Sequence, residues 1–135
     1  MRTIKFRGRS GNSWAYGNLH IVEHEEYGDS AYIIGSGSTT IVDINTIGQF
    51  TGLYDKNRKE IYEGDIIRSF DSKGDPIIHY LLYDNKEAGF VAILKGSAKG
   101  DFGYGRCYQQ CITGCEKEVI GNIYDDPELL KIMKQ

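Results

Sequence analysis

The stretch HIVEH has the H-x-x-E-H spacing of inverted zinc peptidases, formed here by His20, Glu23 and His24. In that chemistry the two histidines lie one helical turn apart and bind zinc, while the glutamate polarises the attacking water. Here the flanking segments are strand-like and turn-like, and Ile21 and Val22 are β-branched. Because residues four apart in a strand are separated by about 13 Å, they could not share one ion. We therefore predict a strand with exposed histidines, and a zinc-dependent hydrolase is the remote alternative.

A second candidate for metal chemistry is the series Cys107, Cys111 and Cys115. On a helix these thiols would line one face and could hold zinc or an iron–sulfur cluster. The spacing lacks the C-x-x-C knuckle of structural zinc sites, and the segment CITGC contains a helix-weakening glycine. We predict apolar or half-buried thiols, with metal binding left open. An odd number of cysteines does not form a disulfide framework and is typical of a reducing compartment.

The stretch QFTGLYDKNRKEIYEGDIIR, from Gln49 to Arg68, contains several carboxylates that could suggest a calcium-binding site. A calcium loop counted from Asp55 needs a glycine at its sixth position and a glutamate at its twelfth, where this sequence has Glu60 and Ile66. Basic residues also alternate with the acids, so the local charge is near neutral. The stretch is predicted to form two turns that set the register of neighbouring strands, with no metal and no cofactor.

The first residues of the chain form a basic segment. By strand alternation Lys5, Arg7 and Arg9 share one face, and no acidic residue occurs among the first nine residues. Such a stripe could bind the phosphates of a nucleic acid. The alternative is an edge strand whose charges discourage edge-to-edge pairing.

A glycine-rich segment, KGDFGYGRCY, interleaves aromatic and basic side chains: Phe102 and Tyr104 precede Arg106. Stacking aromatics beside phosphate-pairing cations are the features that hold single-stranded nucleic acid. Asp101 interrupts the pattern, so a loop whose aromatics pack on the barrel or on a partner is the favoured interpretation. Our candidate binding residues are accordingly Lys5, Arg7, Arg9, Phe102, Tyr104 and Arg106.

The elements that would position these residues are short strands. Apolar and polar residues alternate with period two, and turn-forming residues recur every 8 to 12 residues or so, which indicates an all-β fold. We predict a single domain over residues 1–135 with an antiparallel, barrel-like arrangement, of which an SH3-like barrel is one form, or a sandwich. After EVIGNIY, the segment DDPELL predicts a short C-terminal helix with Asp125 or Asp126 as N-cap.

Composition limits the class of protein. The 135 residues include 40% hydrophobic and 26% charged residues, and the formal net charge is −3, which argues against coating nucleic acid by net charge alone. The longest apolar run, FVAIL, is far shorter than the roughly 18 residues of a membrane span. The N-terminal arginines precede no apolar run, so no secretory signal is expected. We expect a cytoplasmic protein with no membrane partner.

Three blocks of the sequence resemble the YopX-like family of phage and prophage proteins: IKFR at 4–7, the stretch at 49–68, and EVIGNIYDDPELL at 118–130. The resemblance implies a mostly-β fold, a phage setting in the host cell, and no established catalytic residues. We therefore expect a non-enzymatic accessory protein that binds a protein partner, from host or phage, with a homo-oligomer as one form. The alternative is a nucleic-acid-binding module that uses the basic first strand and the glycine-aromatic loop.

Overall fold

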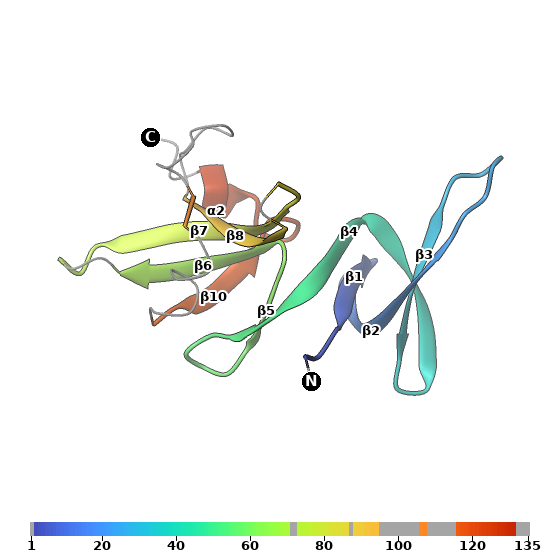
Figure 1. The fold of residues 1–135 in the computed structure, drawn as a ribbon, viewed down its shortest axis with the longest axis horizontal. Helices are drawn as coiled ribbons and strands as arrows, with labels where there is room; N and C mark the ends of the chain where they lie inside the picture. Colours follow the sequence, from blue (N-terminus) through green and yellow to red (C-terminus); the bar gives the residue numbers. More distant parts are fainter. Residues whose placement is uncertain (1, 71–72, 87, 95–105, 108–115, 132–135) are drawn as a thin grey trace. The chain divides into compact units, whose positions relative to one another are not determined.

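The computed structural model describes residues 2–70, 73–86, 88–94, 106–107 and 116–131 (Figure 1). The chain divides into two compact units, Met1–Gly52 and Leu53–Gln135. Antiparallel strands make up nearly all of the regular secondary structure in the described residues of both units, so the predicted all-β class is confirmed. Whether the units behave as one domain over residues 1–135 stays a prediction.

The first unit is built from a sheet that closes on itself. Its strands are β1 (Phe6–Ser10), β2 (Ser13–Val22), β3 (Ser30–Gly35) and β4 (Ser38–Tyr54), whose last residues pass into the second unit. Because β1 pairs with β2 and also with β4, the ladder β1-β2-β3-β4 returns to β1, which is a barrel-like arrangement. Its interior is filled by Ala31, Ile33 and Val42, against which Phe6 and Leu19 pack.

Strand β2 changes partner in its middle, at Gly17. Its first half pairs with β1, and pairing with β3 runs from Asn18 to Val22. Gly17 has a φ of 153°, and a Cβ there would lie 2.2 Å from the carbonyl oxygen of Ile34. Only glycine allows this close approach, so Gly17 is the point at which the sheet can bend to close.

The second unit contains a five-stranded antiparallel sheet with the order β10-β6-β7-β8-β9. Its elements are β6 (Asp65–Phe70), β7 (Pro76–Asp84), β8 (Gly89–Leu94), β9 (Arg106–Cys107), β10 (Glu118–Asn122) and the helix α2 (Glu128–Lys131). The short strand β5 (Glu60–Tyr62) pairs with β4. Ile61, Ile67, Leu81 and Ala92 form the core of this unit.

The predicted C-terminal helix is present as the single turn α2, and a hydrogen-bonded turn precedes it. Strand β10 ends at Asn122, because the Asn122 side chain accepts hydrogen bonds from the backbone N–H groups of Tyr124 and Asp125 and so forms a turn. The carboxylate of Asp126 accepts the N–H of Asn122 (3.2 Å), while its carbonyl accepts the N–H of Leu129 (3.0 Å). Asp126 therefore stabilises the turn that precedes the helix through hydrogen bonds.

Candidate functional site

A hollow of about 480 Å³ opens at one end of the closed sheet of the first unit. The β1–β2 register places Ser10 opposite Ser13, and the β3–β4 register places Thr40 opposite Ile33, so these four residues face the interior at its mouth. Ala15 follows on the same face of β2. We call this feature the mouth hollow. It is lined by Ser10, Ser13, Trp14, Ala15, Tyr16, Ile33, Gly35, Ser36, Ser38 and Thr40.

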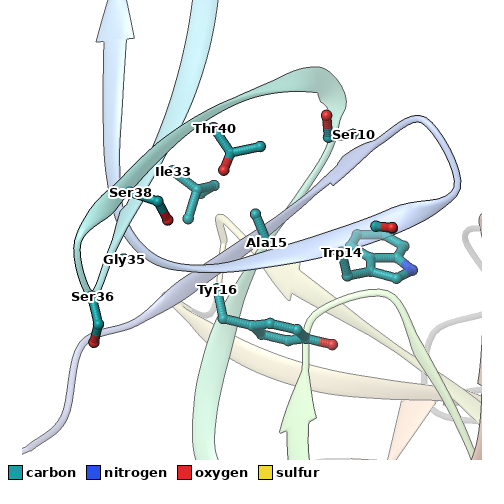
Figure 2. A pocket seen from close by; sticks show the side chains of 10 residues that line it. Ser10, Trp14, Ala15, Tyr16, Ile33, Gly35, Ser36, Ser38 and Thr40 are labelled. Atoms are coloured by element: carbon teal, nitrogen blue, oxygen red, sulfur yellow. The ribbon is translucent and has the colours of Figure 1, made fainter.

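Trp14 and Tyr16 also border the mouth hollow, but alternation along β2 puts their side chains on the face opposite to that of Ala15 (Figure 2). The guanidinium of Arg7 lies 4.6 Å from the centre of the Trp14 ring, which is a cation–π contact. This contact holds one aromatic of the hollow in place. Tyr16 is 46% exposed, so it is partly accessible to solvent.

The basic residues predicted from the first strand do share a face, but they do not form an exposed stripe. Arg7 is only 5% exposed and packs on Trp14. Lys5 is half-buried, and its carbonyl accepts the backbone N–H of Phe50. Arg9 is also half-buried and donates from Nε to the carbonyl of Gly11 (3.0 Å). The expectation that Arg7 lies on an exposed surface is therefore wrong, because the hairpin brings an aromatic ring to its guanidinium.

The other predicted binding residues come from the glycine-rich segment. Phe102 and Tyr104 lie outside the described residues, and Arg106 is described only as backbone in β9, opposite Ile93. The series of cysteines is likewise incomplete: Cys107 is described as backbone opposite Ala92, and Cys111 and Cys115 lie outside the described residues. Binding at this segment stays a prediction.

A second surface of the first unit is apolar and faces away from its core. Tyr32 and Ile41 are directly opposite each other on β3 and β4, and Ile34 follows Tyr32 on the same side of β3. Ile34 is 42% exposed and Ile41 58% exposed, while Tyr32 is half-buried. We call these three residues the outer apolar face. The cross-strand neighbours of this face on β2 and β4 are polar: His20 is opposite Tyr32, and Asn18 and Thr39 are opposite Ile34.

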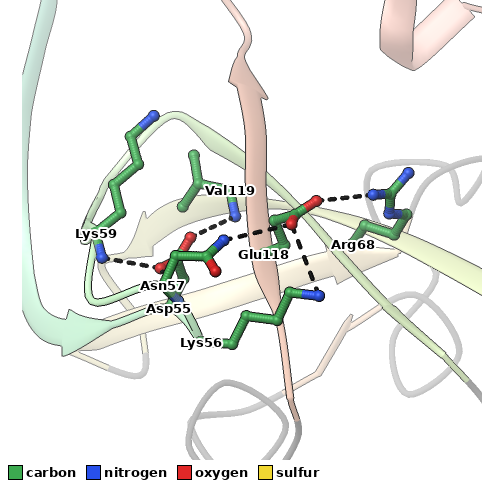
Figure 3. A network of polar contacts seen from close by, with 7 residues as sticks. All are labelled: Asp55, Lys56, Asn57, Lys59, Arg68, Glu118 and Val119. Carbon is green, nitrogen blue, oxygen red and sulfur yellow. Dashed lines mark hydrogen bonds and ion pairs between the residues drawn. The ribbon is translucent and has the colours of Figure 1, made fainter.

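The acidic turn at 55–59 has a structural role (Figure 3). Asp55 is buried, and its Oδ1 accepts the N–H groups of Asn57 and Lys59, both at 2.8 Å. Its Oδ2 accepts the N–H of Val119 on β10 (3.1 Å). Lys56 N–H also donates to the carbonyl of Lys117. The turn thus covers an edge of β10 that would otherwise offer free backbone groups.

The hydrogen bonds of Asp55 also decide its ionisation. Burial alone would raise the pKa of this carboxyl, but the N–H groups of Val119, Lys59 and Asn57, with the nearby charge of Lys59, outweigh it and hold the pKa below the ordinary 3.8. The carboxylate is therefore the form that the fold requires.

Glu118 completes the polar network of Figure 3. Its carboxylate accepts from Arg68 at 2.7 Å and from the side-chain amide of Asn57 at 3.4 Å, and the ammonium of Lys56 lies 3.7 Å away. These contacts join the turn, β6 and β10. As predicted, the acidic stretch consists of turns that position strands.

No group of three or more histidine, cysteine, aspartate or glutamate side chains within the described ranges is placed to hold a metal ion. His20 belongs to β2, whereas His24 follows the end of that strand. The helix that an H-x-x-E-H zinc site requires is therefore not formed there. Among the described residues, no helix is long and apolar enough to span a membrane.

No local sequence pattern indicated the mouth hollow or the outer apolar face. One usable signal was the pair Gly11-Asn12 between two alternating segments, which is typical of a tight hairpin and would have set Trp14 opposite Arg9. The closure of β1 onto β4 pairs residues far apart in the chain and has no local signal.

The fold and these surfaces define an all-β protein with two antiparallel sheets, one of which is closed. The model of the family described as YopX protein matches residues 3–131, and the chain belongs to this family. Protein EF1440 from Enterococcus faecalis is similar, with 25% identity and a TM-score of 0.53, over 96% of this chain and 99% of that one. YopX from Bacillus subtilis shares the fold, with 18% identity and a TM-score of 0.55, over 96% and 97% of the two chains. No curated protein matches the sequence.

Proposed function

We propose that this chain is a non-enzymatic phage or prophage accessory protein that acts in the host cytoplasm by binding a protein partner through the outer apolar face. The observation that carries the proposal is the exposure of Ile34 and Ile41 beside Tyr32 on adjacent strands. Fully burying an isoleucine side chain contributes about 1.5–3 kcal/mol relative to leaving it in water. Covering these half-exposed residues would thus supply a substantial part of the free energy of association.

The surroundings of the outer apolar face support a protein partner. Interfaces combine an apolar centre that includes aromatic residues with a polar rim, and charged residues are depleted at the centre. Tyr32, Ile34 and Ile41 form such a centre, and His20 and Asn18 border it on β2. A second copy of the chain is one partner that fits, because two such faces are self-complementary in character.

The non-enzymatic part of the proposal is supported by the carboxylates that the structure brings together. Asp55 accepts three backbone N–H groups, and Glu118 is paired with Arg68 and Lys56. Both are occupied in holding strands, whereas a general acid or base needs a free oxygen within reach of a substrate.

The test is to purify tagged protein from prophage-induced or infected host cells, with and without nuclease, and to compare wild type with Ile41→Asp. Asn12→Asp in the exposed β1–β2 turn is the matched control, since it also adds one negative charge. We expect a near-stoichiometric, nuclease-resistant protein that the control retains and Ile41→Asp loses. Sedimentation of the two variants separates self-association from a different partner. Retention by a folded Ile41→Asp variant would refute the outer apolar face as the binding surface.

A nucleic-acid-binding module is the second candidate, favoured by the placement of Arg9 directly opposite Trp14, with Arg7 opposite Tyr16. Aromatic and cationic side chains on one hairpin face are the ingredients of single-strand binding. This candidate predicts affinity for single-stranded DNA or RNA that falls with salt. If the Arg9 side chain neutralises one phosphate, Arg9→Ala should reduce the slope of log K against log salt concentration by about 0.7. An affinity that changes neither with salt nor with Arg9→Ala would exclude the nucleic-acid-binding candidate.

A further inference from the structure

The charged residues of the first unit are unevenly distributed along the chain. From Ser10 to Asp55 the sequence contains no lysine and no arginine, although this range includes all of β2, β3 and β4. The turn between β2 and β3, residues 23–29, has the sequence EHEEYGD, and every one of its residues is exposed. We call it the acidic turn. Its carboxylates form a concentrated negative charge, and the strands that it joins carry no lysine or arginine to balance it.

The acidic turn lies at one end of the outer apolar face, where β2 and β3 end together (Figure 1). His20 is opposite Tyr32 and Val22 is opposite Ser30, so alternation continues the outer apolar face along both strands up to the turn. Asp29 is three residues from Tyr32, which corresponds to about 10 Å along a strand. Since the Debye length is also about 10 Å at 0.1 M ionic strength, the turn acts electrostatically on anything that covers this end of the face.

The other borders of the outer apolar face carry no comparable charge. Ile34 is followed by the β3–β4 turn, residues 35–38, with the uncharged sequence GSGS. Asp43 lies two residues after Ile41 on the same side of β4, but it is opposite Arg9 of β1, whose charge offsets it. The surface therefore has a direction, apolar at Ile34 and Ile41 and acidic beyond Tyr32.

We propose that the partner on the outer apolar face is a protein with a basic segment, which lies over the acidic turn while apolar side chains of the partner pack on Ile34 and Ile41. This inference rests on the proposed function, because it names the chemistry of the partner at that same surface. Complementary charge steers association and rejects partners of like charge. A symmetric dimer would set the face against its own copy, which supplies no lysine or arginine from β2, β3 or β4.

A short extended segment of the partner is long enough to span this surface, because the five residues from Asp29 to Ile34 cover about 17 Å. The test therefore selects binders from a library of random dodecapeptides on the purified full-length chain, with Ile41→Asp as the counter-selection. We expect the peptides that wild type retains and Ile41→Asp loses to combine apolar residues with an excess of lysine and arginine. The most enriched peptide is then synthesised with a fluorescent label and titrated by fluorescence polarisation.

The acidic turn is tested by removing two of its carboxylates with Glu25→Gln and Glu26→Gln in one variant. Loss of two exposed ion pairs should weaken peptide binding roughly threefold to tenfold at about 0.1 M salt. The difference from wild type should nearly disappear at about 1 M salt, where the Debye length is about 3 Å. The matched control is Glu116→Gln with Glu128→Gln, since both residues are exposed in the second unit and the same charge is removed. Circular dichroism confirms the fold of each variant.

Each outcome separates the basic partner from the proposed function. Selected peptides that depend on Ile41 but carry no excess of basic residues, or that bind the turn variant as they bind wild type, would overturn the basic partner and leave the outer apolar face as the binding surface. Basic peptides that a folded Ile41→Asp variant still retains would refute both. The inference is also overturned if no peptide is retained, or if sedimentation of wild type shows a dimer that Ile41→Asp abolishes, which would assign the face to a second copy.

Discussion

Replacing Asp55 by asparagine would remove one negative charge while keeping the shape of the side chain. The amide oxygen can still accept from Asn57 and Lys59, whose N–H groups lie 2.8 Å from Oδ1. The amide nitrogen would occupy the position of Oδ2, where the N–H of Val119 now donates at 3.1 Å. Two donors would then face each other, and the bond between the turn and β10 would be lost.

The expected cost follows from that single lost bond. Leaving a buried donor without an acceptor destabilises a protein by about 1–3 kcal/mol, and the Val119 bond is partly buried, so we expect a loss of about 2 kcal/mol in the free energy of unfolding. With a urea m-value of about 2 kcal/mol per molar, the unfolding midpoint should fall by about 1 M.

Urea unfolding at pH 7, followed by circular dichroism, measures this shift, and amide hydrogen exchange at Val119 locates it. Glu116→Gln is the control, because Glu116 is exposed in the same unit and loses the same charge. The pKa of Asp55 is lower in the folded state than its ordinary 3.8, so its stabilisation is present above that pH and is lost as the pH falls through the folded value. The difference between wild type and Asp55→Asn should therefore shrink in acid. A midpoint shift no larger than that of the control, with Val119 still protected, would refute the reasoning.

Further variants test other parts of the fold. Gly8→Ala would place a Cβ 2.6 Å from a methyl of Val42, so a loss of about 1–3 kcal/mol is expected in urea unfolding, and an unchanged midpoint would contradict the packing of β1. Burial lowers the pKa of His79 below 6.5, so on acidification the unfolded chain takes up this proton before the folded chain does. The free energy of unfolding should therefore fall as the pH drops below about 6.5. His79→Leu should flatten this pH dependence in thermal melts between pH 5 and 7. The pair of Glu118 with Arg68 is partly exposed, so Glu118→Gln should cost less than about 1 kcal/mol, and a larger loss in the same urea assay would mean that the network is more strongly coupled than its geometry indicates.

Local patterns were sufficient to predict most strands. The apolar runs IIHYLLYD and FVAIL correspond to β7 and β8. The second predicted turn of the 49–68 stretch, at Gly64 and Asp65, leads into β6, and Gly64 has a φ of 93°. The hairpin that reverses at 55–59 was also predicted, because aspartate and asparagine form turns through hydrogen bonds to nearby backbone. Strand β4 is longer than the sequence indicated, since its segment from Ile41 to Phe50 alternates imperfectly.

The candidate sites depended on contacts that no local pattern encodes. The basic first strand was recognised from Lys5, Arg7 and Arg9, but the burial of Arg7 results from the position of Trp14 across the hairpin. The mouth hollow needs the β1–β2 hairpin, the β3–β4 turn and the closure of β1 onto β4 at once. Which residues of β3 face outward as an apolar surface follows from that closure as well.

The sequence by itself determined the all-β class, the positions of the main turns, the short final helix and membership of the YopX family. The reason is that strand alternation, turn residues and short sequence blocks are properties of neighbouring residues. Only the tertiary structure decided which face of each strand is covered, that Asp55 holds β10, and that Trp14 and Tyr16 border a hollow without charge. The reason is physical: burial and pairing depend on segments separated by tens of residues, and each strand's period of two offers two faces of which tertiary packing selects one.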